Sequence, residues 1–192
     1  MEIKKKKGIN IFYAFILFLG FVSCNPAEQY KTELSEIDSS LQVIDSLEML
    51  FDGIEFDSLK LMAEHVINNE KQIKLLYKPD TLDENLGKLM NEAKTVRKKL
   101  GNVQKDQVAF GDELNAVKNQ FKDLKADILE GLYDDQQIEE YLNVEKAALN
   151  KVFVGFTGFH KMQIGEKGRY YHATPLIDEY IKNLKSKNDI GG

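Results

Sequence analysis

Proline is scarce in this chain. Its three prolines are Pro26, Pro79 and Pro175, and 95 residues separate the last two. Because proline costs about 3 kcal/mol in the interior of a helix, a gap of this length permits long uninterrupted helices. After residue 30, apolar residues recur at steps of three and four, which is the period of one helix face. The sequence therefore predicts an all-α fold.

The first two apolar stripes precede the second proline. One predicts a helix over residues 28–51, which ends at a nearby glycine. The other predicts a helix that ends near residue 76, with Asp57 or Ser58 as its N-cap. Asn69 falls on this second stripe, where a polar residue more often fixes the register of neighbouring helices than binds a ligand.

The next two stripes predict a helical hairpin. The third helix begins at Thr81, which forms a capping box with Glu84, and ends at Gly101. The fourth helix carries apolar residues over 110–128 and closes near Gly131. Since the connection between the two helices is short, we expect them to lie antiparallel.

Residues 152–160, VFVGFTGFH, at first look like a strand because they are rich in valine, phenylalanine and glycine. The three-and-four spacing runs through them, so we interpret residues 135–164 as one helix, with a short hairpin at 152–160 as the alternative. The glycines at 165–168 then mark a connection, and Thr174-Pro175 starts a last short helix. We expect an up-and-down bundle of long antiparallel, heptad-patterned helices.

The first 24 residues differ from the rest. Lysines occupy positions 4–7, and 15 mostly apolar or small residues follow from Ile9 to Ser23. A charged start, an apolar core and a small-residue exit are typical of a secretory signal peptide. A retained membrane span is the alternative, although it needs roughly 20 apolar residues.

The signal ends in Phe21-Val22-Ser23-Cys24, which resembles the lipobox of bacterial lipoproteins. Phe21 stands where leucine is most common in that family. The resemblance implies that Cys24 receives a diacylglyceryl group on its thiol, that a dedicated signal peptidase cuts before it, and that the new amino end is acylated. The alternative is an incidental thiol in an ordinary signal peptide. As the only cysteine, Cys24 cannot form an internal disulfide.

This interpretation divides the chain into a signal peptide that is removed (1–23), a lipid-anchored tether (24–29), a single helical-bundle domain (30–187) and a frayed tail (188–192). Loss of the signal peptide removes four lysines and one glutamate, which takes the formal charge from −5 to about −8. So acidic a chain lacks the basic footprint that nucleic acid requires, and anionic lipid headgroups repel it. We therefore expect membrane contact through the lipid on Cys24.

The sequence contains no recognisable catalytic, metal or cofactor motif. The three histidines, His65, His160 and His172, do not have the spacing of zinc ligands on one helix face. Adjacent carboxylates such as Asp134 and Asp135 fall in first turns of helices, where they stabilise the helix dipole. We expect no enzymatic activity, no metal and no cofactor.

Aromatic residues gather towards the end of the chain. They form either the core against which the last helix docks or a groove for a peptide, a lipid or a cell-wall fragment. Tyr170 and Tyr171 are expected in an exposed connection, where their replacement would leave stability almost unchanged. The residues expected to contact a partner or ligand are Phe153, Phe156, Phe159, His160, Tyr170, Tyr171 and Tyr180.

Two functions fit these features. The first is a non-enzymatic, membrane-tethered module that binds or braces another protein of the bacterial cell envelope. The second is a carrier or sensor that holds a small apolar molecule or wall fragment between helices. Neither Asn25 nor Pro26 is the aspartate that retains lipoproteins at the inner membrane in some bacteria, so we expect an outer-membrane anchor that faces the periplasm.

Replacement of the cysteine tests the anchor. In a Cys24→Ala chain we expect no acylation and an uncut precursor, because the thiol is the acceptor that the lipoprotein peptidase requires. Mass spectrometry of the wild-type and variant N-termini measures both effects. The same unmodified N-terminus in the two chains would contradict the lipobox interpretation.

Overall fold

The computed structural model describes residues 25–78, 81 and 83–190. The described residues are mostly helical and include no strand, which confirms the predicted all-α class. Cys24 and the predicted signal peptide lie outside the described residues. The helices are α2 (Pro26–Gln29), α3 (Lys31–Asp52), α4 (Phe56–Leu76), α5 (Glu84–Leu100), α6 (Val103–Leu129) and α7 (Asp135–Ile190).

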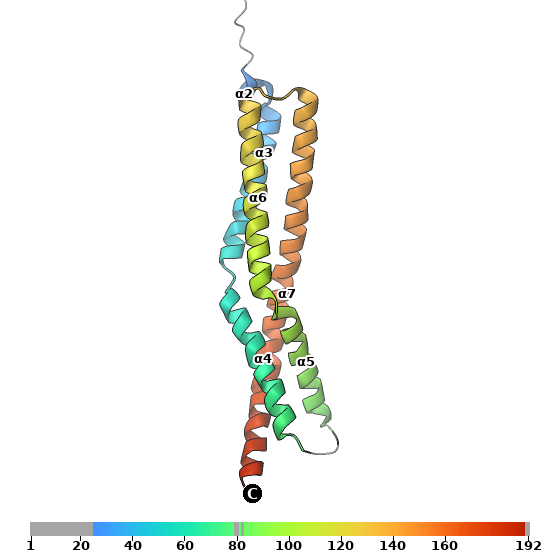
Figure 1. Cartoon of the computed structure of the whole chain (residues 1–192). Helices are drawn as coiled ribbons and strands as arrows, with labels where there is room; N and C mark the ends of the chain where they lie inside the picture. Colours follow the sequence, from blue (N-terminus) through green and yellow to red (C-terminus); the bar gives the residue numbers. More distant parts are fainter. Residues whose placement is uncertain (1–24, 79–80, 82, 191–192) are drawn as a thin grey trace, which may run out of the picture.

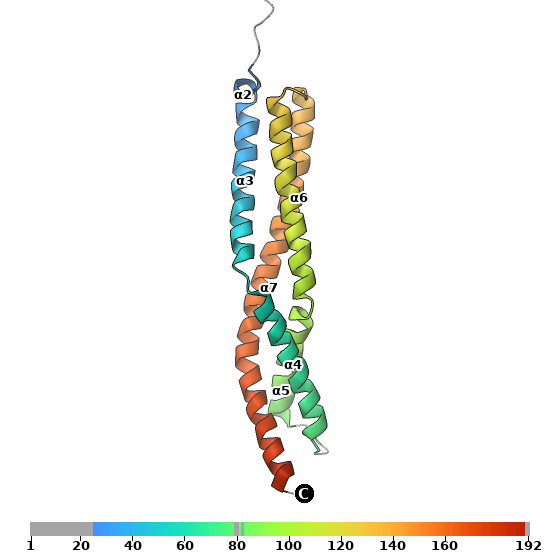
Figure 2. The ribbon, with the colours of Figure 1, turned by 60° about the vertical axis from the view of Figure 1, so that its left-hand side comes forward.

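The helices form a long rod with three legs (Figure 1). α3 and α4 follow each other along the first leg, α5 and α6 return along the second, and α7 alone makes the third (Figure 2). α2 lies at one end of the rod and the C-terminal end of α7 lies at the other. We call the half with α3 and α6 the proximal half, and the half with α4 and α5 the distal half.

The predicted hairpin between the third and fourth helices is wrong. α5 and α6 run end to end in the same direction (Figure 1). Gly101 keeps helical dihedral angles (φ −64°, ψ −18°), and the helical path is interrupted only at Asn102 (φ −112°, ψ 9°), so the chain does not turn back. A Cβ atom on Gly101 would lie 2.7 Å from the Arg97 carbonyl oxygen, which explains why glycine occupies this break.

α7 is one helix of 56 residues, about 80 Å long at about 1.5 Å per residue. Residues 152–160 are helical, so the alternative of a hairpin there is wrong. The predicted connection at 165–168 and the separate last helix are also wrong. Pro175 lies inside α7, where its missing N–H leaves the Tyr171 carbonyl without the usual donor. The helix continues because Ala173, Ile177 and Ile181 are buried where α7 packs on α4 and α5.

Some helix ends also differ from the prediction. α4 begins at Phe56, before either predicted cap, and α5 begins at Glu84. Asp83, and not Thr81, caps α5, because its carboxylate accepts the Leu86 N–H at 2.9 Å. Residues 188–190, predicted to be frayed, continue α7, whereas residues 191–192 lie outside the described part. The predicted tether contains the helix α2, which packs on α3 and α6.

Five phenylalanines pack together where α3 passes into α4. The centroids of neighbouring rings lie 5.3 to 6.2 Å apart. Such tilted and stacked pairs add to the stabilisation that burial of the rings provides. All three legs contribute to this cluster, which we call the phenylalanine joint: Phe51, Phe56, Phe110, Phe156 and Phe159.

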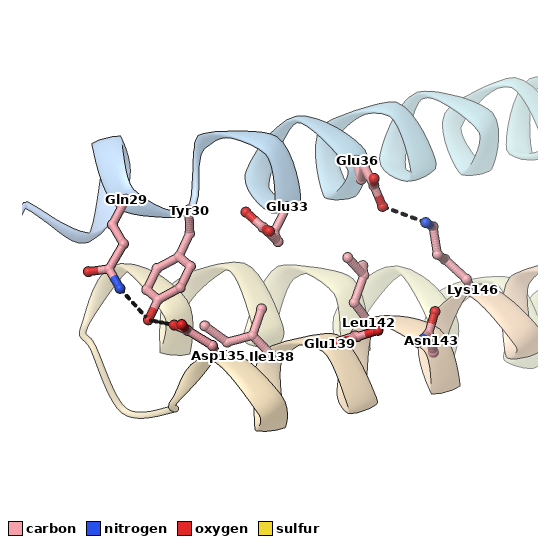
Figure 3. A pocket seen from close by; sticks show the side chains of 10 residues that line it. All are labelled: Gln29, Tyr30, Glu33, Glu36, Asp135, Ile138, Glu139, Leu142, Asn143 and Lys146. Carbon is pink, nitrogen blue, oxygen red and sulfur yellow. Dashed lines mark hydrogen bonds and ion pairs between the residues drawn. The ribbon is translucent and has the colours of Figure 1, made fainter.

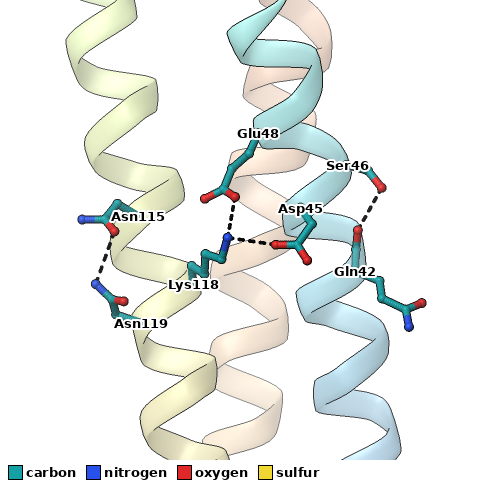
Figure 4. Close-up of polar contacts among 7 residues, drawn as sticks. All are labelled: Gln42, Asp45, Ser46, Glu48, Asn115, Lys118 and Asn119. Carbon is teal, nitrogen blue, oxygen red and sulfur yellow. Dashed lines mark hydrogen bonds and ion pairs between the residues drawn. The ribbon is translucent and has the colours of Figure 1, made fainter.

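Ion pairs link α3 to α6 beside the apolar core of the proximal half. Lys118 of α6 lies between Asp45 and Glu48 of α3 (Figure 4). These hydrogen bonds raise the pKa of the Lys118 ammonium. A second pair joins Lys125 to Asp38. Within the described residues, no helix combines the length and apolar character needed to cross a bilayer.

Candidate functional site

The residues predicted to contact a partner all lie on α7, but the helix separates them. From Phe153 to Tyr180 the backbone rises about 40 Å, so these side chains do not form one groove. They fall in three places: at the phenylalanine joint, in a polar cluster between α4 and α7, and towards the distal end of the rod. Cys24 lies outside the described residues.

The first place is core rather than surface. Phe156 is 1% exposed, and Phe159 is also buried, with its ring stacked on Phe56 at 5.9 Å. Phe153 points away from this core and is 44% exposed. The ring of His160 is partly buried and lies 6.1 Å from that of Phe156. Phe156 and Phe159 therefore hold the joint, and Phe153 is free to contact a partner.

Tyr170 belongs to a polar cluster that joins α4 to α7. Its hydroxyl lies 2.8 Å from His65 Nδ1, and His65 Nε2 lies 3.2 Å from Asp178 Oδ1. Asn69, which is 3% exposed, donates its Nδ2 hydrogen to the same carboxylate oxygen at 2.6 Å. Burial, with smaller contributions from Asp178 and Tyr171, raises the pKa of the Tyr170 phenol. The predicted exposed connection is thus a partly buried network.

This cluster is built to hold helices together. Both ring nitrogens of His65 are engaged, one by the Tyr170 hydroxyl and one by the Asp178 carboxylate, so the ring of this α4 residue contacts two residues of α7. Asn69 donates its hydrogen bond from the core stripe of α4. At this position the sequence favoured a residue that fixes the register of neighbouring helices. The arrangement fixes how α4 and α7 align along the rod.

Several buried positions of α7 between the phenylalanine joint and the distal end of the rod are polar. Gln163, Glu166 and Thr174 are all more than nine-tenths buried, and one oxygen atom of each has no hydrogen-bond partner within the described residues. Arg169 pairs with the other carboxylate oxygen of Glu166. A buried polar atom without a partner costs about 1 to 3 kcal/mol. Burial of these polar atoms therefore makes the core of the distal half less stabilising than that of the proximal half.

Beside the polar cluster, α4 and α7 border an open hollow of about 350 Å³. Asn69 and Asp178 form part of its wall. Two lysines of α7 also line it, and neither forms an ion pair with any part of the chain that the structure describes. The lining residues are His65, Asn68, Asn69, Gln72, Asp178, Ile181, Lys182, Lys185 and Ser186.

Exposed apolar side chains share the faces of α4 and α7 that carry this hollow. Leu61 and Leu75 lie seven residues before and after Asn68, and therefore on the same side of α4. Tyr171 and Ile164 lie seven and fourteen residues before Asp178 on α7. Leu75 is 70% exposed and Tyr171 is 63% exposed. We call this surface, with the hollow at its centre, the distal face: Leu61, Leu75, Ile164 and Tyr171.

Tyr180 does not line the hollow. It is partly buried against the core, and its ring centroid is 6.5 Å from that of Tyr77, the C-cap residue of α4. Burial, with Asp83 and Tyr77 nearby, raises the pKa of the Tyr180 phenol. This contact closes the distal end of the rod, so Tyr180 has a packing role.

No family model, curated protein or solved structure matches this chain. The site is therefore interpreted from its own geometry. Among residues 25–78, 81 and 83–190, no three histidine, cysteine, aspartate or glutamate side chains are grouped so that they could hold a metal ion. The distal face offers hydrogen-bonding groups and apolar contact area, which are the components of a binding surface.

The two neighbouring tyrosines should respond differently to truncation. Tyr170→Ala should lower the free energy of unfolding by about 1 to 3 kcal/mol, because it leaves the Nδ1 atom of His65 without a partner. Tyr171→Ala should have almost no effect, because its side chain is exposed. Phe156→Ala should cost about 3 to 5 kcal/mol, as is usual for a fully buried ring. Urea unfolding followed by circular dichroism measures all three, and equal stability of the two tyrosine variants would contradict the structure.

Proposed function

We propose that this chain is a lipoprotein of the bacterial cell envelope whose rod acts as a non-enzymatic binding module. Lipid on Cys24 would hold the proximal end in the outer membrane, with the rod in the periplasm. The proximal end supports this proposal. The Asn25 side chain accepts the Ala27 N–H at 3.2 Å, and α2 packs on α3 and α6, so helical packing begins directly after the predicted anchor.

The observation that carries the proposal is the position of the distal face. It lies in the half of the rod that faces away from residue 25 (Figure 1). Tyrosine and leucine side chains are exposed there around a polar hollow, although α7 buries apolar residues along its core stripe. Exposed aromatic anchors beside hydrogen-bonding groups are typical of protein interfaces. The rod would hold this surface away from the membrane for another envelope protein to bind.

The second hypothesis, a carrier of a small apolar molecule, is less well supported. It requires space between the helices near Phe156 and Tyr170. The Phe156 ring is buried among Phe51 and Phe110, and the Tyr170 hydroxyl lies against His65. These contacts leave little of either side chain for a ligand, so a protein partner is the better proposal.

Capture of the partner from crosslinked cell envelopes tests this function. We expect the wild-type chain to recover one protein in stoichiometric amount. A Tyr171→Ala/Leu75→Ala chain should recover at least about tenfold less of it, because loss of two exposed anchors at an interface costs more than about 1.4 kcal/mol.

The matched control is Leu129→Ala/Leu132→Ala, which removes two exposed leucines at the proximal end. This variant should recover the partner as the wild type does. Failure to recover a stoichiometric partner under several growth conditions, or equal loss in both variants, would contradict binding through the distal face.

A further inference from the structure

The hollow in the distal face is basic although the chain as a whole is acidic. Lys182 and Lys185 line it and form no ion pair within the described residues. Asp178 supplies the only lining carboxylate, and it already accepts from Asn69 and lies against His65. Neither ammonium group therefore forms an ion pair within the described residues, although the chain carries a net charge of −5. An unpaired positive site of this kind favours an anionic group.

The uncharged groups in and beside the hollow indicate which kind of anionic ligand it can bind. Asn68 and Ser186 add side chains that can donate hydrogen bonds. Beside the hollow, the apolar side chains of Leu75 and Tyr171 are exposed. A free inorganic anion such as phosphate makes no apolar contact, whereas a peptide segment with an acidic side chain can also cover Leu75 and Tyr171.

We infer that the hollow receives an acidic side chain from a peptide segment of the partner. This inference rests on the proposed function and gives the chemistry of its binding surface. The carboxylate would lie at Lys182 and Lys185. A volume of about 350 Å³ has room for one such side chain and its peptide unit. Neighbouring apolar residues of the segment would contact Leu75 and Tyr171.

The experiment measures binding of short labelled peptides to the full chain in detergent by fluorescence anisotropy. The probe alternates leucine with pairs of glutamates, and two matched peptides replace glutamate by glutamine or by lysine. We expect the glutamate peptide to bind about tenfold more tightly than either match, because each match loses or reverses two ion pairs with the lysines. Added inorganic phosphate at the peptide's concentration should not displace it.

A charge variant locates the contact. Lys182→Gln/Lys185→Gln should weaken binding of the glutamate peptide about tenfold, for the same two ion pairs. Its control, Lys98→Gln/Lys99→Gln, removes two exposed lysines from the last turn of α5 and should leave the affinity unchanged. Unfolding curves of both variants should match the wild type, since none of these four lysines is buried.

Several results would overturn the inference. These are no binding of the glutamate peptide, equal binding of the glutamine peptide, equal weakening in both lysine variants, or displacement by phosphate. The capture experiment separates this inference from the proposed function. If the Lys182→Gln/Lys185→Gln chain recovers the partner as well as the wild type, only the acidic-segment inference fails. If no chain recovers a partner, the proposed function itself fails.

Discussion

Packing of five phenylalanine rings at the middle of the rod is the interaction on which the rest of the structure depends. The first leg breaks between α3 and α4, and the second breaks between α5 and α6. α6 contacts both α3 and α4, so it bridges the first break, while α7 runs past both. The joint ties the three legs together near the first break, because Phe51 and Phe56 flank that break and Phe156 and Phe159 come from α7. Without this packing, only α7 and the contacts between α4 and α6 would connect the two halves.

The two halves differ in how their cores are made. The proximal half buries mainly aliphatic and aromatic residues and adds ion pairs between α3 and α6. The distal half places Asn69, Gln163 and Glu166 in its core and depends on a hydrogen-bonded cluster across α4 and α7. Polar groups in a core specify one alignment of helices at some cost in stability. The surface proposed for binding thus lies on the half whose helix register is fixed by polar contacts.

Periodicity was sufficient to predict the helices but not their order in space. The core positions Phe156 and Phe159 followed from a spacing that only a helix satisfies. The direction of α6 did not follow from the spacing. A glycine after a helix usually predicts that the chain turns, whereas Gly101 stays close to helical geometry. Pro175 led to the wrong prediction of a separate last helix. The helix continues through it because burial of its neighbours Ala173 and Ile177 outweighs the lost hydrogen bond. The polar cluster was not predictable, because His65 and Tyr170 lie 105 residues apart and share no local motif.

The length of α7 is the most direct test of this account, because one unbroken helix is what separates the distal face from the predicted anchor. The measurement is the distance between spin labels on Gln136→Cys and Lys187→Cys in a Cys24→Ala chain, by double electron–electron resonance. An unbroken helix predicts about 75 Å at about 1.5 Å per residue. A distance below about 50 Å would mean that the chain turns back between the labels, and it would contradict the rod.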